Sequence, residues 1–292
     1  MKKGIFIIFL IILLPYIILN IFYYEKDNDI LVKVKTNDKI LSIPLEEYIV
    51  HVVAGEIPVS FNDEALKAGA IVSRSYAIYK IKKNNSYDVT DNTLTQIYLT
   101  DEELKEKWKN DYLKNLQKIK DVVYKTKGQV LVYDGNVIEA LFFSTSPGYT
   151  ENSNEVFKEE RPYLKSVPSS WDQASPVFRE VNYFDKQDFC DKLSIKCSNL
   201  NIEITETTST GRSKKIKVNN KIFASDDFIK KLNLKSTFLT IEVTSDSVII
   251  ETKGYGHGVG MSQYGANELA LKGYRYDEIL KYYYQGVQIK KI

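Results

Sequence analysis

The chain has few of the residues that metal sites and redox sites require. It contains two cysteines and two histidines in 292 residues. Two cysteines cannot build a zinc site of four thiolates, and His51 and His257 belong to no His-Glu-x-x-His motif. The sequence therefore contains no metal motif made of neighbouring residues.

The chain also lacks a clear excess of charge of either sign. The chain has 40 Lys or Arg and 38 Asp or Glu, a formal net charge of +2. A surface that neutralises nucleic-acid phosphates needs clustered, uncompensated basic residues, so this balance argues against a nucleic-acid partner. With 43% hydrophobic and 27% charged residues, the composition is that of a globular chain that buries a substantial core.

The first 24 residues differ from the rest. Lys2 and Lys3 precede residues 4–24, an uncharged run dominated by Ile, Leu and Phe. At about 1.5 Å per residue, this run spans the roughly 30 Å hydrocarbon core of a bilayer. It ends in aromatic residues without a small-x-small cleavage site, which favours an uncleaved transmembrane anchor. We expect a single-pass cell membrane protein with a cytoplasmic tip at residues 1–3 and an extracytoplasmic domain at residues 25–292.

No internal repeat and no Pro-rich or Gly/Ser-rich linker is visible in the remaining chain, so we expect one compact domain there. Outside the cytosol, Cys190 and Cys197 could close a short disulfide loop. Two free, buried thiols are an equally open alternative.

Hydrophobic periodicity predicts an α+β fold, with helices in the N-terminal half followed by a strand-rich C-terminal half. A Thr100-x-x-Glu103 capping box and an Asp134-Gly135 hairpin turn are the clearest local signals. We expect strands at 30–34, 40–43, 130–133, 137–143, 202–206, 215–218 and 239–251, and helices at 44–57, 63–83, 100–119, 267–271 and 277–284.

The segment Ala54-Gly55-Glu56-Ile57-Pro58 places a carboxylate on the apolar face of a predicted helix. Glu56 follows Val52 and Val53 on the stripe that should face the core. Burial there would raise the pKa of the carboxyl and keep it protonated for use as a general acid. From this segment alone, a surface glutamate at a frayed helix end is the simpler interpretation.

Two further segments carry polar groups in unusual places. Arg74 interrupts an Ala-rich predicted helix and could hold Glu56 or a sugar carboxylate, with a surface cation as the simpler alternative. Residues 143–153 crowd hydroxyl, amide and carboxylate groups directly after a predicted buried strand. Such a loop suits hydrogen bonding to a polyhydroxyl ligand, although a plain polar turn has the same composition.

Residues 254–266, with the sequence GYGHGVGMSQYGA, form the most unusual segment, because five of the chain's 14 glycines lie there. This density predicts positive φ angles and close backbone approach to another group. The spacing excludes a dinucleotide-binding loop, a Walker loop and a nucleophile elbow. A Gly-rich bend would not explain why His257, Ser262 and Gln263 lie within the segment.

Together these segments resemble those of the stage II sporulation protein D family. Members of that family are bacterial peptidoglycan lytic transglycosylases. The family pattern combines Ala-Gly-Glu-x-Pro, Ala-Leu-Lys-Ala with Arg-x-Tyr, Gln-x-Tyr, Ser-Thr-Ser followed by Thr-Glu-Asn, and Gly-His-Gly-Val-Gly-Met-Ser-Gln-x-Gly-Ala. This chain carries these motifs in the same order at residues 54–58, 65–76, 96–98, 144–152 and 256–266. The match extends over nearly the whole extracytoplasmic domain, and the last motif is the most specific.

The chain departs from that pattern at three positions. Phe143 stands where the family usually has His, Pro147 where Gly is usual, and Gly69 where Gln is usual. Some relatives bind zinc through Cys and His placed just before Gln-x-Tyr. The resemblance implies no bound metal and no cofactor here, because the chain has Thr90, Leu94 and Thr95 in that region.

The resemblance implies that Glu56 is the catalytic acid. Its carboxyl would protonate the glycosidic oxygen between N-acetylmuramic acid (MurNAc) and N-acetylglucosamine (GlcNAc), and its carboxylate would then take the proton of the muramic C6 hydroxyl, giving a 1,6-anhydro end. One carboxylate suffices for this, whereas a hydrolase needs two. The residues that the resemblance places along the glycan groove are Arg74, Tyr76, Gln96, Tyr98, Ser144, Thr145, Ser146, Gly148, Glu151, His257, Gly258, Ser262 and Gln263.

The resemblance also implies a cellular setting. The family acts in the mother-cell membrane during engulfment in endospore formation, beside a peptidoglycan amidase, stage II sporulation protein P, and the membrane protein M of the same set. It prefers glycan strands from which that amidase has removed the stem peptides. We therefore expect peptidoglycan strands and these two proteins as partners.

Two other functions stay open. Some relatives are described as amidase enhancers, so the chain could be a non-catalytic, glycan-binding activator of a cell-wall amidase. The absence of the usual His at Phe143 keeps this alternative open. A serine hydrolase built on Ser262 and His257 is a weaker alternative, because both residues lie in one loop and no nucleophile elbow frames the serine.

Overall fold

The computed structural model describes residues 30–36, 39–81, 83, 86–91, 95–157 and 159–292. The transmembrane anchor predicted at residues 4–24 lies outside these residues. Within the described part of the chain, no helix has the length and apolar character needed to cross a membrane. The predicted α+β class is confirmed, and the longest helices of the described chain lie in the N-terminal half.

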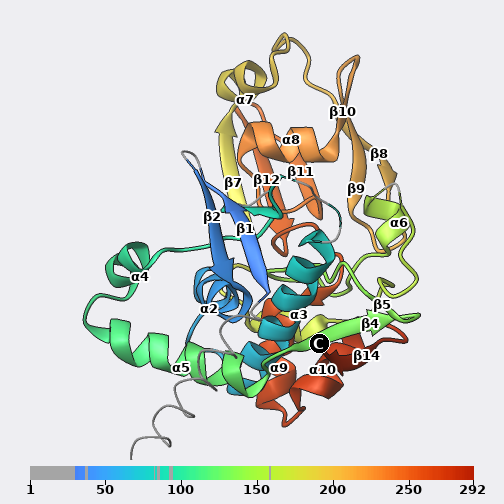
Figure 1. Ribbon diagram of the computed structural model, residues 1–292. Helices are drawn as coiled ribbons and strands as arrows, with labels where there is room; N and C mark the ends of the chain where they lie inside the picture. The colour runs from blue at the N-terminus through green and yellow to red at the C-terminus, as the bar shows by residue number, and fades with distance from the viewer. Residues whose placement is uncertain (1–29, 37–38, 82, 84–85, 92–94, 158) are drawn as a thin grey trace, which may run out of the picture.

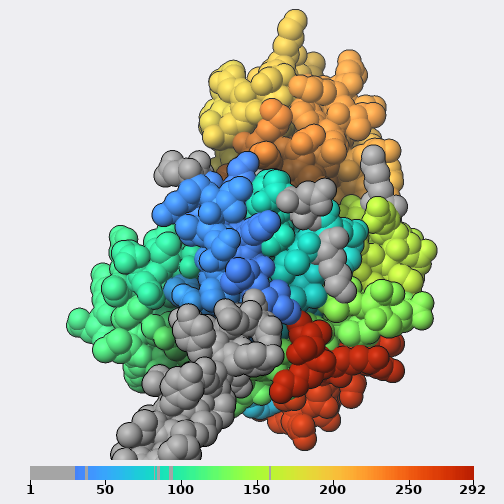
Figure 2. Space-filling model, in the orientation of Figure 1, coloured from blue at the N-terminus to red at the C-terminus, as the bar shows by residue number. Residues whose placement is uncertain are grey.

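Two separate hydrophobic cores organise the fold. Residues of the larger core come from positions 32–167 and 259–287, and residues of the smaller core from positions 184–250. We call residues 179–253 the inserted lobe and the other described residues the main lobe. Figure 2 shows the inserted lobe, coloured yellow to orange, at one end of the main lobe. No linker-like composition marks its boundaries, so this second core was not predicted from the sequence.

Helix α3 (Asp63–Ile81) lies near the centre of the main lobe (Figure 1). Its small residues allow neighbouring elements to approach closely. A Cβ atom at Gly69 would lie 2.1 Å from Cδ1 of Ile57, so the glycine makes room for that side chain. The helices that contact α3 are α2 (Leu45–Glu56), α5 (Tyr112–Lys125), α9 (Gln263–Leu271) and α10 (Tyr276–Tyr283).

The predicted capping box is confirmed, because Thr100 and Glu103 cap helix α4 (Asp101–Trp108) reciprocally. The single helix predicted over 100–119 is wrong. Lys109 has a φ of +47°, a positive value that an α-helix of L-residues cannot continue through. A short 3-10 helix, η1 (Lys109–Asp111), therefore separates α4 from α5.

Small sheets flank the helices of the main lobe. Strand β1 (Leu31–Lys35) pairs antiparallel with β2 (Ile40–Pro44) and parallel with β3 (Val89–Thr90). The Asp134-Gly135 turn is confirmed, with φ angles of +46° and +75°. The strand predicted over 137–143 is instead divided, because its two ends pair with different partners. The strands concerned are β4 (Gln129–Tyr133), which pairs with β5 (Asn136–Val137) and β14 (Gln288–Lys291), and β6 (Phe142–Phe143), which pairs with β13 (Met261–Ser262).

The inserted lobe consists of antiparallel sheets and two helices. Cys190 and Cys197 form a disulfide in this lobe, which decides between the two alternatives for these residues. The strand predicted over 239–251 is broken by a turn at Thr244, whose N–H donates to the carbonyl of Ser247. The sheets are ordered β11 (Leu239–Val243), β12 (Ser247–Lys253), β7 (Arg179–Asp185), and β10 (Lys221–Ala224), β9 (Ser213–Val218), β8 (Ile202–Thr207), and the helices are α7 (Lys186–Leu193) and α8 (Ser225–Leu232).

Two short helical segments lie between strand β6 of the main lobe and the start of the inserted lobe. Helix α6 (Ser153–Val156) follows the polar loop after β6. The 3-10 helix η2 (Ser170–Ala174) precedes the inserted lobe and contacts α9. Both segments therefore lie beside the loops that carry the sequence motifs.

Candidate active site

A cavity of about 640 Å³ lies in the main lobe beside the C-terminal end of α2. Residues of all the sequence motifs converge on it, although they are far apart in the chain. Aromatic side chains form much of the wall, and polar groups are few. The predicted site residues that line it are Glu56, Tyr76, Gln96, Ser144, His257 and Gln263, together with the aromatic residues Phe143, Phe157, Tyr255 and Tyr264.

Glu56 is the last residue of α2 and is half-buried in the cavity wall. The N–H of Ile97 donates to its Oε1 at 2.7 Å. Gly55 permits this contact, since a Cβ there would lie 2.8 Å from the carbonyl oxygen of Ile97. Burial raises the pKa of the Glu56 carboxyl, and the Ile97 hydrogen bond and the charge of Lys107 partly oppose that shift. A carboxyl in this setting can hold a proton and then bear a charge, as a general acid must.

The motif at the start of α9 is tied to Glu56 through the backbone. Gln263 donates from Nε2 to the main-chain oxygen of Glu56 at 3.3 Å. Ser262 is the N-cap of α9, and its Oγ accepts from the N–H of Gly265 at 3.2 Å. Ser262 is fully buried, so it positions Gln263 and does not face the cavity.

Asp172 in η2 holds the loops around the cavity together, and it was not among the residues predicted from the sequence. Its buried carboxylate accepts from the N–H of Ser146 at 2.7 Å, from the hydroxyl of Ser169 at 2.5 Å and from the hydroxyl of Ser262. Burial raises the pKa of Asp172 to about 6. A lone Asp in a polar segment has no spacing pattern that would have singled it out.

His257 lies where the cavity meets a second one, because it lines both, and the residue is exposed. The rings of Phe143 and Phe157 are both 5.8 Å from it, centroid to centroid. Desolvation by the surrounding protein and the charge of Arg212 lower the pKa of His257 below its usual value, so the ring is neutral at pH 7. Its Nδ1 accepts from the N–H of Val259 at 3.0 Å.

The catalytic pair of a serine hydrolase is not formed. The hydroxyl of Ser262 donates to Asp172 and contacts the carbonyl of Ser144 at 3.2 Å, whereas His257 bonds to the backbone of its own loop. No group of three or more His, Cys, Asp and Glu side chains comes together as metal ligands within the described residues.

Arg74 is not placed to touch a sugar, and the suggestion that it holds Glu56 is wrong. It is fully buried, and its Nε and Nη2 donate to the two carboxylate oxygens of Glu46 at 2.9 and 2.7 Å. Another donor goes to the carbonyl of Gln129 at 3.1 Å. Its small neighbours on α3 leave the long side chain room in the core, where it joins α2, α3 and β4.

Tyr98 also lies outside the cavity lining. Its ring stacks on Tyr48 and His51, with centroids 5.8 and 5.2 Å away. Tyr48 in turn donates to Oε1 of Gln96 at 3.1 Å, which fixes the buried amide of that residue beside the cavity. Tyr98 therefore supports Gln96 indirectly, by packing against Tyr48.

The polar loop after β6 uses most of its groups internally. The hydroxyl of Thr145 bonds to Ser144 and Ser175 at 3.1 and 2.9 Å, and Ser146 accepts from the N–H of Gly148 at 3.2 Å. Gly148 has a φ of +136°, which favours glycine. Thr145 and Ser146 are fully buried, so of the three predicted hydroxyls Ser144 alone lines the cavity.

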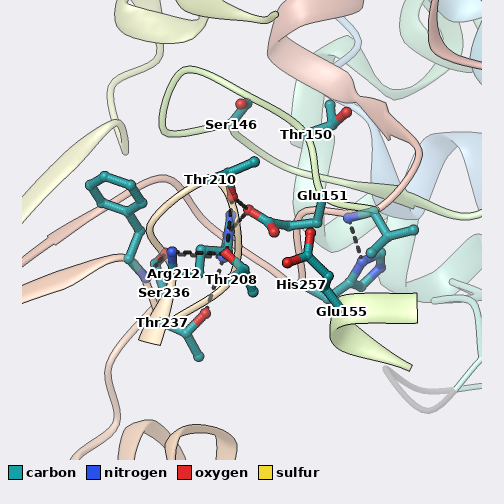
Figure 3. Close-up of polar contacts among 12 residues, drawn as sticks. Ser146, Thr150, Glu151, Glu155, Thr208, Thr210, Arg212, Ser236, Thr237 and His257 are labelled. Atoms are coloured by element: carbon teal, nitrogen blue, oxygen red, sulfur yellow. Dashed lines mark hydrogen bonds and ion pairs between the residues drawn. The ribbon is translucent and has the colours of Figure 1, made fainter. Parts of the chain in front are cut away.

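Glu151 and Gly258 meet a residue that lies in none of the sequence motifs. Glu151 is fully buried and its Oε1 lies 3.3 Å from Nε of Arg212, a residue of the inserted lobe (Figure 3). A Cβ at Gly258 would lie 2.8 Å from the same Nε, so only glycine leaves room for the guanidinium. The last motif is therefore shaped in part by contact with the inserted lobe.

Comparison with known proteins agrees with these motifs. The family described as Stage II sporulation protein (SpoIID) matches residues 33–133. Stage II sporulation protein D of Bacillus subtilis (strain 168) is 40% identical over 263 residues, which cover 87% of this chain and 77% of that protein.

Two further relatives extend the comparison. Stage II sporulation protein D of Bacillus amyloliquefaciens is 39% identical over 264 residues, covering 88% of this chain and 77% of that protein. The amidase enhancer of Bacillus subtilis (strain 168) is 30% identical over 294 residues, covering 82% of this chain and 39% of that longer protein. Because the two D proteins are this similar over most of both chains, the protein belongs to the stage II sporulation protein D family.

Proposed function

We propose that the protein is a lytic transglycosylase of the cell wall. It cleaves the MurNAc–GlcNAc bond of peptide-stripped peptidoglycan strands and leaves 1,6-anhydro-MurNAc ends. The observation that carries the proposal is the place of Glu56, a half-buried carboxyl with a raised pKa on the wall of a large, aromatic-lined cavity. Two relatives named stage II sporulation protein D support a role in sporulation.

Glu56 serves the two proton transfers of this reaction in turn. Its protonated carboxyl gives a proton to the glycosidic oxygen as the bond from that oxygen to the muramic C1 breaks. The C6 hydroxyl of the same sugar then bonds to C1, and its proton goes to the Glu56 carboxylate, so no water is consumed. The Ile97 N–H and the Lys107 charge stabilise the carboxylate between the two transfers.

The composition of the cavity favours ring closure over hydrolysis. Among the described residues that line it, Glu56 is the only carboxylate. A glycosidase that uses water needs a second carboxylate, either as a nucleophile about 5 Å away or as a base about 6.5 to 9.5 Å away. Rings such as Tyr76 and Tyr255 offer apolar faces to sugars, and Ser144 and Gln263 offer hydrogen-bonding groups.

The cellular part of the proposal follows from the family. We place the protein in the mother-cell membrane during engulfment, held by residues 4–24, with stage II sporulation proteins P and M as partners. A second candidate function is a non-catalytic, glycan-binding activator of a cell-wall amidase, because a relative carries the name amidase enhancer.

The test compares two glutamates of the same helix. Glu56→Gln should lower the rate of fragment release from peptide-stripped strands at least about 100-fold, since general acid–base groups contribute factors of about 10² to 10⁴. The control Glu47→Gln changes an exposed residue of α2 and should keep the activity. Unchanged activity of Glu56→Gln would remove this residue from the mechanism. Stimulation of a partner amidase without any strand cleavage would favour the second candidate.

A further inference from the structure

Four exposed lysines lie together where helix α5 ends and strand β14 pairs with β4. The N–H of Ile292 donates to the carbonyl of Gly128 at 2.9 Å, which brings the end of β14 beside the end of α5 (Figure 1). A Cβ at Gly128 would lie 3.3 Å from Cγ of Lys291, so this side chain passes over the glycine. The members of this lysine cluster, none of which takes part in an ion pair within the described chain, are Lys125, Lys127, Lys290 and Lys291.

An open groove of about 650 Å³ continues the lysine cluster. Lys290 and Lys291 line it together with Arg275 and Lys281. Among the described residues of its wall, Asp277 is the only acidic one. Its two carboxylate oxygens lie 3.3 Å from Nε of Arg275 and 3.8 Å from Nζ of Lys281. One carboxylate therefore faces four cations, and the groove has an excess of positive charge.

The start of the described chain lies at the same end of the main lobe. The carbonyl of Ile30 accepts from the N–H of Leu45, the first residue of α2, at 2.8 Å. The next residue of α2, Glu46, accepts from the N–H of Gly128 at 3.0 Å. Because Glu46 is also paired with the buried Arg74, it does not neutralise the lysine cluster. Ile30 is therefore connected through α2 to the glycine around which the lysines lie.

Apolar side chains are exposed beside these cations. Leu31 and Tyr124 are each 52% exposed, and Ile30 is 39% exposed. Leu31 pairs with Pro44 just before α2, and Tyr124 precedes Lys125 at the end of α5. Lysines next to exposed apolar and aromatic side chains are typical of surfaces that meet the headgroup region of a bilayer. We call the whole set the basal face, which consists of Ile30, Leu31, Tyr124, Lys125, Lys127, Arg275, Lys281, Lys290 and Lys291.

We propose that the basal face contacts the anionic phospholipid surface of the membrane that holds the protein. This inference rests on the proposed function, which places residues 4–24 in that membrane. Residues 25–29 separate this segment from Ile30, so Ile30 can lie no further than roughly 22 Å from its end. Anionic headgroups attract lysines over about 8 Å at physiological salt. A soluble anionic polymer has no such tether to this end of the domain, which favours the membrane.

The contact leaves the candidate active site open. Glu56 lies at the other end of α2 from Leu45, about 16 Å away along the helix axis. None of the described residues that line the cavity of Glu56 belongs to the basal face. The basal face can therefore contact the bilayer while the cavity takes up a glycan strand, and it fixes the height of the cavity above the membrane.

Chemical labelling of the full chain in vesicles tests this contact. The chain is reconstituted into phosphatidylcholine vesicles with or without about 30% phosphatidylglycerol as the anionic lipid. Its lysines are acetylated with an uncharged reagent, and the rate at each lysine is measured by mass spectrometry. We expect Lys290 to react at least about threefold more slowly in the anionic vesicles, and this protection to disappear at about 1 M salt. Lys196, an exposed lysine of the inserted lobe, should react equally in both.

Two variants with the same loss of charge locate the contact. A chain carrying Lys125→Gln, Lys127→Gln and Lys291→Gln should lose the protection of Lys290, because the attraction to the headgroups is removed. The matched control carries Lys196→Gln, Lys230→Gln and Lys231→Gln, three exposed positions of the inserted lobe, and should keep that protection.

The outcomes separate this inference from the proposed function. Equal labelling of Lys290 in both kinds of vesicle, on a chain that floats with them, would overturn the basal contact alone. Equal protection of Lys196, or loss of protection in the control variant, would overturn it as well. Protection by soluble polyphosphate and not by vesicles would assign the face to an anionic polymer instead. A chain that floats with neither kind of vesicle would also overturn the membrane location in the proposed function.

Discussion

Two fully buried arginines mark two regions of the molecule that differ in kind. In the middle of the main lobe, Arg74 forms a two-point pair with Glu46 and bonds to backbone carbonyls. At the junction of the lobes, Arg212 has one contact of 3.3 Å with Glu151 and donates from Nη1 to the carbonyl of Gly256 at 3.0 Å, but its Nη2 has no hydrogen-bond partner in the described chain. Both arginines are equally buried. The hydrogen-bond donors of Arg74 are satisfied, whereas those of Arg212 are not all satisfied.

This difference separates a buried arginine whose donors are all satisfied from one that keeps an unsatisfied donor. Every nitrogen of the Arg74 guanidinium donates to a protein oxygen. These bonds join α2, α3 and β4 and leave no donor for a ligand. Arg212 is a wall residue of a cavity, but its Nη2 is buried and has no hydrogen-bond partner in the described part of the chain. The unsatisfied donor of Arg212 therefore needs an explanation that the fully bonded Arg74 does not.

The largest effect on stability is expected at Arg74. Arg74→Gln removes one partner of a buried ion pair and should lower the free energy of unfolding by about 3–5 kcal/mol, because Glu46 is left uncompensated. Urea denaturation of the full chain measures this. Arg179→Gln, which breaks the exposed pair of Arg179 with Glu251, should change stability little. A loss for Arg74→Gln as small as for that control would contradict the scaffold role.

Arg212→Gln should cost less stability than Arg74→Gln, about 1–3 kcal/mol at pH 7. Burial already raises the pKa of Glu151, so this carboxyl can take a proton when its cation is removed. Its folded-state pKa then lies further above the unfolded value, and stability falls as pH rises through that range. The deficit against the unmodified chain should therefore shrink between pH 7 and pH 5 in urea titrations. A deficit independent of pH would contradict this account.

Gly258→Ala changes the contact between Arg212 and the last motif directly. The added Cβ would lie within 2.9 Å of three guanidinium atoms of Arg212, at a φ of +84°. We expect a loss of about 1–2 kcal/mol and a severalfold weaker binding of peptide-free glycan. Gly273→Ala is the matched control, because its φ is +93° and no atom would lie within 4 Å of its Cβ. Equal effects of both changes would show that backbone strain alone is responsible.

Glu56→Gln should have the smallest effect on stability while it removes activity. Burial disfavours the charged carboxylate in the folded state, so the folded-state pKa is raised and stability declines as pH rises above the unfolded value. A neutral glutamine avoids that cost and can still accept the Ile97 N–H. Its melting temperature at pH 7 should equal or exceed that of the unmodified chain. A clear decrease would mean that Glu56 is mainly structural.

Local signals in the sequence predicted the elements that depend on nearby residues. The Thr100 capping box and the Asp134-Gly135 turn have fixed spacing and backbone requirements, and both are confirmed. Pairing between distant segments has no such local code. The short parallel pair of β6 with β13, and the second core of the inserted lobe, were therefore not predicted.

The candidate site was predicted in the same uneven way. Glu56, Ser144, His257 and Gln263 line one cavity, as their place in motifs led us to expect. Motifs also contain residues that hold the fold, such as Arg74, and sequence alone does not separate the two kinds. Asp172 and Arg212 carry no pattern with their neighbours, because the groups they serve come from other segments.

The chemistry of the glycan ends tests the central claim most directly. The full chain is incubated with peptide-stripped strands, and the released ends are measured by mass spectrometry, with Glu56→Gln as the control. We predict 1,6-anhydro-MurNAc ends, each lighter by one water than a reducing end, that disappear in the control. Reducing MurNAc ends made by the unmodified chain, or no new ends at all, would contradict the account.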